Sequence, residues 1–85
     1  MISRSVTVTT TRAVVFTASP NWRTVLLHVM GNGIVYLGGS DVTSSNGMPT
    51  EKGAVPIELA IPANETVYAV VASSTEDLRI LEPIG

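Results

Sequence analysis

The chain contains one histidine, His28, and histidine is the side chain that most often transfers protons near neutral pH. Nucleophilic catalysis would need a serine activated by that histidine and a carboxylate that orients the ring. Ser40 and Asp41 follow a stretch that we expect to pair with the His28 strand, which could bring the three side chains together. No serine, however, lies in a nucleophile-elbow pattern. We therefore predict an ordinary strand histidine with one ring nitrogen hydrogen-bonded, no catalytic residue and no enzymatic activity.

A second candidate for chemistry is the polar stretch that follows. Its side chains alternate in the loose manner of a calcium loop, at Asp41, Thr43, Ser45 and Gly47. An EF-hand needs Gly at its sixth position and Glu at its twelfth, but here these positions hold Asn46 and Lys52. The chain also has no cysteine, which excludes thiolate metal sites. We expect no metal and no cofactor, and instead a loop whose Ser, Thr and Asn side chains bond its own amides.

The composition indicates a small protein with little charge on its surface. The 85 residues are enough for one domain, residues 1–85, and they are 45% apolar but only 14% charged. An ordinary globular chain is roughly 25% charged. One interpretation is a compact sandwich coated with Thr and Ser. We favour the other, in which part of the apolar surface is buried against further subunits, because a small core alone gives modest stability.

The net charge of −2 is unevenly distributed along the chain. Residues 1–40 contain three arginines and no acidic residue (+3), whereas residues 41–85 contain two basic and seven acidic residues (−5). This split could steer packing between copies, or the strand order could mix the two halves in space and erase it. The five basic residues do not cluster, so we expect no nucleic-acid partner.

The residues that would position a functional site are predicted to lie in β-strands. Val, Ile and Thr supply 28 of the 85 residues, and no helical period is sustained. Alternation and turn residues predict an all-β fold, a compact antiparallel β-sandwich or small barrel of about seven short strands. The predicted strands are residues 5–10, 13–18, 23–30, 34–37, 54–61, 67–72 and 78–81.

Turn residues also suggest which strands pair. Gly31-Asn32-Gly33 predicts a hairpin that pairs residues 34–37 with a central strand, 23–30. A last hairpin is predicted between 67–72 and 78–81, with Glu76-Asp77 in a solvated turn. Pro56 lacks an amide hydrogen, so its strand should lie at a sheet edge or be bulged there. The longest loop should run from 38 to 52, after a turn for which Gly38-Gly39 supply unusual backbone angles.

The N-terminal residues do not resemble a secretory signal, and no apolar run approaches the ~20 residues of a membrane span. We therefore expect a protein made in a cytoplasm, without a membrane partner. The aromatic residues are few, and Trp22 follows the turn residues Pro20 and Asn21, where it would be an exposed anchor. The predicted docking surface consists of Trp22, Tyr36, Gly38, Gly39, Ser40, Asp41, Val42, Asn46 and Met48.

Two stretches carry a resemblance to a known class of proteins. The run Val-Tyr-Leu-Gly-Gly-Ser-Asp-Val-Thr-Ser-Ser-Asn-Gly at 35–47, with Val-Tyr-Ala-Val-Val-Ala at 67–72 and Leu-Arg-Ile-Leu at 78–81, resembles small β-rich virion proteins of tailed bacteriophages, of the head-decoration or minor structural kind. The residues before Arg23 match only in general β character.

The resemblance implies a non-enzymatic protein of the virion, made in the bacterial host cytoplasm. It implies copies that bind the outer head lattice, often as homotrimers, and stabilise it; the partner is then the major capsid protein or another virion protein. The alternative is a tail, baseplate or head-fibre module that binds a host surface glycan, which predicts an exposed aromatic pair such as Trp22 with Tyr36.

Overall fold

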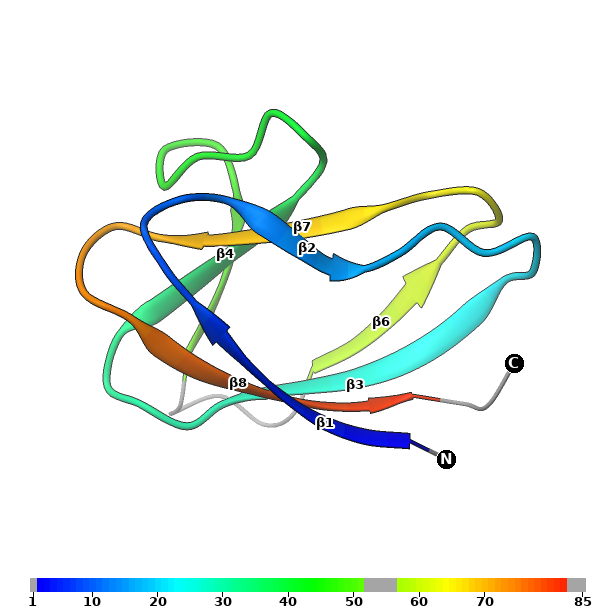
Figure 1. Ribbon diagram of the computed structural model, residues 1–85, viewed down its shortest axis with the longest axis horizontal. Helices are drawn as coiled ribbons and strands as arrows, with labels where there is room; N and C mark the ends of the chain where they lie inside the picture. The colour runs from blue at the N-terminus through cyan, green and yellow to red at the C-terminus, as the bar shows by residue number, and fades with distance from the viewer. Residues whose placement is uncertain (1, 52–56, 83–85) are drawn as a thin grey trace.

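The computed structural model describes residues 2–51 and 57–82, and they form two antiparallel four-stranded sheets packed face to face (Figure 1). The predicted all-β sandwich is therefore confirmed, with eight strands rather than seven. The strands are β1 (Ile2–Val8), β2 (Ala13–Phe16), β3 (Arg23–Val29), β4 (Ile34–Gly38), β5 (Met48–Glu51), β6 (Ile57–Ile61), β7 (Val67–Val71) and β8 (Glu76–Glu82). The extra strand, β5, lies inside the stretch predicted to be one long loop, because Thr50 takes an interior position opposite Val35.

Sheet A has the strand order β1-β8-β3-β6, and sheet B has the order β2-β7-β4-β5. Four of the pairings join β1 to β8, β2 to β7, β3 to β6 and β4 to β5. The chain is thus one long hairpin of eight strands rolled into a sandwich, with residues 39–47 at its apex and the paired strands β1 and β8 at the other extremity (Figure 1). This order is that of a jelly roll, which is built from two Greek keys.

The core lies between the sheets and follows the period-two alternation of the strands. On β3, Val25, Leu27 and Val29 point inward and are essentially unexposed, while Leu26 and Met30 remain partly exposed on the outer side. β3 lies between β8 and β6, so its predicted central position is confirmed. The buried cluster consists of Val8, Val15, Phe16, Val25, Leu27, Val29, Val35, Leu37, Ile61, Ala69, Val71, Leu78 and Ile80.

A charged group closes one end of this core. Glu82 accepts a 2.7 Å hydrogen bond from Arg4 Nε and lies 3.9 Å from Arg23 Nη1. Both guanidinium groups also stand over the ring of Phe16, at 5.4 Å and 5.7 Å from its centroid. Arg4 and Arg23 belong to the first half of the chain and Glu82 to its end, so this group ties the two ends of the long hairpin together.

Two predicted hairpins are wrong. Gly31-Asn32-Gly33 carries the chain from β3 in sheet A to β4 in sheet B, and residues 72–75 carry it from β7 back to β8. The carboxylate of Glu76 accepts a 2.8 Å hydrogen bond from the Gly33 amide, and it fills the space that a side chain at Gly31 or Gly33 would need. Glu76 is thus a half-buried part of β8 rather than a solvated turn residue.

The strand order also decides between the two interpretations of the charge split. In both sheets, strands from residues 1–40 alternate with strands from residues 41–85. Basic and acidic halves therefore interleave, and the asymmetry along the chain does not become an asymmetry in space. β6 is an edge strand, as predicted, although Pro56 itself lies outside the described residues.

Candidate functional site

The apex loop, residues 39–47, is held by its own polar groups. The Val42 amide donates to the Gly39 carbonyl (3.0 Å) and the Gly47 amide to the Thr43 carbonyl (2.9 Å). The Thr43 amide donates to Asn46 Oδ1 (2.7 Å), and Thr43 Oγ1 accepts from the amides of Ser45 (3.2 Å) and Asn46 (3.3 Å). The predicted self-bonded loop is therefore confirmed.

Val42 fixes this loop to the outer face of sheet B. Its side chain is only 1% exposed although it is not part of the core between the sheets, and its carbonyl accepts from Arg12 Nη1 at 3.4 Å. A hypothetical Cβ on Gly38 would lie 2.8 Å from Val42 Cγ2, and one on Gly47 would lie 2.6 Å from Tyr36 Cβ. Val42 is therefore an internal plug, and its predicted role as a docking residue is wrong.

The same distances explain why glycine occurs at positions 38 and 47. Neither Gly38 nor Gly39 has a φ in the left-handed region, so the predicted need for unusual backbone angles there is wrong. At Gly38 the need is for space, whereas a Cβ on Gly39 would make only an ordinary 3.5 Å contact with Asp41. The left-handed positions belong instead to Asn64 (φ 67°) and Ser74 (φ 59°), which lie in turns between the sheets.

A mainly apolar hollow of about 370 Å³ opens beside the apex, where the edge strands β5 and β6 flank the gap between the sheets. We call it the lateral hollow. It brings together Gly38, Gly39 and Met48 from the predicted docking surface with residues of β6 and β7. It is lined by Leu37, Gly38, Gly39, Met48, Leu59, Ala60, Ile61, Pro62, Glu65, Thr66 and Val67.

Trp22 and Met48 are the most exposed large apolar side chains among the described residues, at 70% each. Met48 lines the lateral hollow directly. Trp22 precedes Arg23, which pairs with Ile61, and Pro62 of the hollow follows Ile61. Trp22 therefore lies at the Pro62 end of sheet A, and its predicted exposure is confirmed.

The remaining predicted docking residues are divided between the loop and the sheet below it. Ser40, Asp41 and Asn46 are exposed on the apex loop. Tyr36 is half-buried on the outer side of sheet B, next to Gly47, whereas Trp22 adjoins sheet A. The predicted aromatic pair of Trp22 and Tyr36 is thus not formed.

Sequence reasoning missed the β6 and β7 side of the lateral hollow, especially Leu59, Ile61 and Val67. The sequence places them in the predicted strands 54–61 and 67–72, but a strand pattern does not say which other strands lie beside them. The sheet order places the edge strand β6 beside the edge strand β5, and the gap between the sheets is open there. No local pattern in the sequence carries that information.

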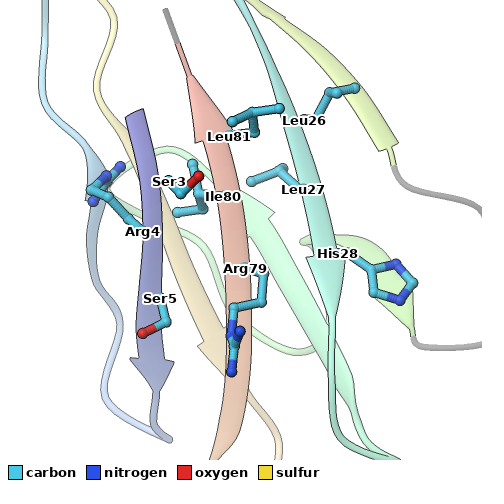
Figure 2. A pocket seen from close by; sticks show the side chains of 9 residues that line it. All are labelled: Ser3, Arg4, Ser5, Leu26, Leu27, His28, Arg79, Ile80 and Leu81. Atoms are coloured by element: carbon cyan, nitrogen blue, oxygen red, sulfur yellow. The ribbon is translucent and has the colours of Figure 1, made fainter. Parts of the chain in front are cut away.

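A second, shallow hollow of about 570 Å³ lies on the outer face of sheet A (Figure 2). Ser3, Ser5, His28 and Arg79 supply its polar groups, and Leu26 and Leu81 supply much of its apolar surface. Figure 2 shows the His28 ring projecting from β3 on the side away from β8, while Arg79 lies along β8. Arg79 Nε is also paired with Asp77 Oδ2 at 3.1 Å, so these polar groups do not converge on one point.

The arrangement does not assemble the serine, histidine and aspartate considered for catalysis. His28 lies on sheet A, whereas Ser40 and Asp41 belong to the apex loop over sheet B. Among the described residues, the His28 ring has no hydrogen-bond partner, so the hydrogen bond predicted for one of its nitrogens is not found there. Within the same residues, no three metal-ligating side chains gather and no helix is long and apolar enough to cross a membrane.

Comparison of the chain with family models, with curated proteins and with solved structures finds no match.

Proposed function

We propose that this chain is a non-enzymatic structural protein of a phage virion, a decoration protein that binds the outer head lattice as an oligomer and stabilises it. Two independent lines support the proposal. The residues at 35–47, 67–72 and 78–81 resemble small virion proteins of tailed phages. The strand order is that of a jelly roll, an architecture used by viral capsid domains.

The observation that carries the proposal is the exposure of two large apolar side chains, one at the lateral hollow and one at the Pro62 end of sheet A. Trp22 and Met48 are each 70% exposed, and Met48 borders the lateral hollow. Exposed aromatic and methionine side chains are typical anchors of protein interfaces, where a few buried residues supply most of the binding energy. A lattice-binding protein needs such a repeated apolar contact and no cofactor.

In this proposal the partner is the major capsid protein or another virion protein, and the copies assemble as a homotrimer on the head surface. The protein is made in the host cytoplasm and resides in the virion. The self-bonded apex loop would then present Ser40, Asp41 and Asn46 to the lattice or to solvent, while Trp22 and Met48 supply the apolar anchor.

The test is sedimentation with heads of the phage that encodes the chain, stripped of their surface proteins. The unmodified protein should co-sediment, and Trp22→Ala should lower its affinity at least about thirtyfold, the size of an interface hot spot. Val14→Ala is the matched control, because Val14 is also an exposed apolar residue but lies on the outer side of sheet B. Undiminished binding by Trp22→Ala would remove Trp22 from the docking surface, and no binding by the unmodified protein would refute the proposal.

The alternative is a tail, baseplate or head-fibre module that binds a host glycan. This alternative predicts an exposed aromatic pair of Trp22 with Tyr36, and these two side chains do not form a pair. Glycan binding by a protein that ignores the stripped heads would nevertheless favour this alternative over the decoration function.

A further inference from the structure

Each sheet of the sandwich ends in two edge strands, and three of them, β1, β2 and β5, differ in how well they are protected against pairing with another chain. β2 has four residues and a break in register between Val14 and Phe16. β5 has four residues, and Pro49 removes one of its amide donors. Short strands, bulges and prolines are the devices by which native proteins block edge-to-edge association.

β1 has none of these devices. It runs for seven residues, Ile2–Val8, in unbroken register with β8, and no described strand pairs with its other side. It contains neither proline nor lysine. Its one charged residue, Arg4, is turned inward, where Nε binds Glu82 and Nη2 donates to the Val15 carbonyl at 2.7 Å. Its outward row consists of the small hydroxyl residues Ser3, Ser5 and Thr7, which leave the edge accessible.

We propose that β1 is the contact between two copies of this chain. The two β1 strands pair antiparallel about a two-fold axis at Ser5, the middle residue of the strand, and join two copies of sheet A into one continuous sheet of eight strands. The contact is isologous, so it closes at two copies. Its unpaired backbone groups become hydrogen-bonded, as in other cases of strand addition.

The residues of β1 favour this register. An axis at Ser5 pairs all seven residues and keeps both copies of sheet B on the same side of the joined sheet. Ser5 then faces Ser5 of the second copy, Ser3 faces Thr7, and Arg4 faces Val6. Cross-strand hydroxyl pairs are favourable. A shift of the axis to Arg4 would oppose two like charges and shorten the overlap, which disfavours it.

This contact goes beyond the proposed function and does not depend on it, since it forms between free copies in solution. It leaves the lateral hollow free, because β1 and β6 are the opposite edges of sheet A. A three-fold assembly on a head would then use a different surface, and a two-fold contact would link such assemblies to one another.

The decisive measurement is the mass in solution by sedimentation equilibrium. We expect the unmodified chain to reach twice its 8.9 kDa monomer mass. Ser5→Lys should raise the dissociation constant at least about tenfold, because it sets two lysines face to face between the two copies of Arg79, the residue that pairs with Ser5 on β8. Thr24→Lys, on the same outer face but on β3, is the matched control and should leave the mass unchanged.

A charge-swap experiment separates this contact from loss of folding. An equimolar mixture of Ser5→Lys and Ser5→Glu should restore the dimer, since lysine then faces glutamate. A chain that remains monomeric at about 1 mM, a dimer that Ser5→Lys leaves intact, or a mixture that fails to recover would each overturn the inference. Binding to stripped heads is measured separately, so its failure does not imitate any of these results.

Discussion

At the scale of single residues, Val42 and the glycines around it pack the apex loop onto sheet B. Val42 is the only large apolar residue between Gly39 and Gly47, and it is buried on the outer face of sheet B. The sequence allowed the polar bonding of this loop to be predicted, because Thr43 and Asn46 act on amides within three residues. It did not allow the burial of Val42 to be predicted, because that depends on the loop folding back over β4.

The space available at Gly47 can be tested directly. A methyl group there would lie 2.6 Å from Tyr36 Cβ and 2.8 Å from Val42 Cγ2. Gly47→Ala should therefore cost about 1–3 kcal/mol of unfolding free energy, as overpacking usually does, measured by urea denaturation. Gly39→Ala is the control, because its methyl group would make only a 3.5 Å contact. Equal stability of the two variants would show that the loop is not packed on sheet B.

The burial of Val42 gives a second prediction. Val42→Ala removes two buried methyl groups and should cost about 2 kcal/mol, since each buried CH₂ contributes roughly 0.8 kcal/mol and a cavity remains. Val14→Ala should cost much less, because Val14 is 42% exposed. Hydrogen exchange of the Gly47 amide should also accelerate in Val42→Ala, and unchanged exchange would contradict the role of Val42 as the anchor of the loop.

At the scale of elements, the positions of the strands were predictable but their partners were not. Val25, Leu27 and Val29 alternate with outer residues, and this local pattern located β3 to within one residue. Gly31-Asn32-Gly33 is equally local and suggested a hairpin, yet the chain there crosses to the other sheet. Only β4 and β5 are neighbours both in sequence and in one sheet. All other pairings are set by burial between the sheets, which short-range turn patterns do not report.

The charged group of Arg4, Arg23 and Glu82 closes one end of the core, and its contribution to stability can be measured. Glu82→Gln leaves Arg4 and Arg23 without a counter-charge over Phe16 and should cost about 1–2 kcal/mol. This is less than for a fully buried pair, because Arg4 is one-third exposed and the amide oxygen still accepts a bond. Asp77→Asn is the control, since the exposed Asp77–Arg79 pair should contribute under about 0.5 kcal/mol. Thermal unfolding of both variants measures the difference.

At the scale of the whole molecule, the rolled hairpin explains why the charge split along the sequence does not become a split in space. Strands from the two halves of the chain alternate in each sheet, and among the described residues the two open sides of the sandwich differ from each other. One open side carries the lateral hollow, beside Met48 and near the end that carries Trp22. Docking of a partner at this end would leave the β1 edge accessible.

The central claim, that the protein stabilises a phage head by binding its outer lattice, is tested most directly by the temperature at which stripped heads release their DNA. Addition of the unmodified protein should raise this temperature, and addition of Trp22→Ala should leave it nearly unchanged. A release temperature that does not respond to the unmodified protein, although the protein is folded and in excess, would contradict the account.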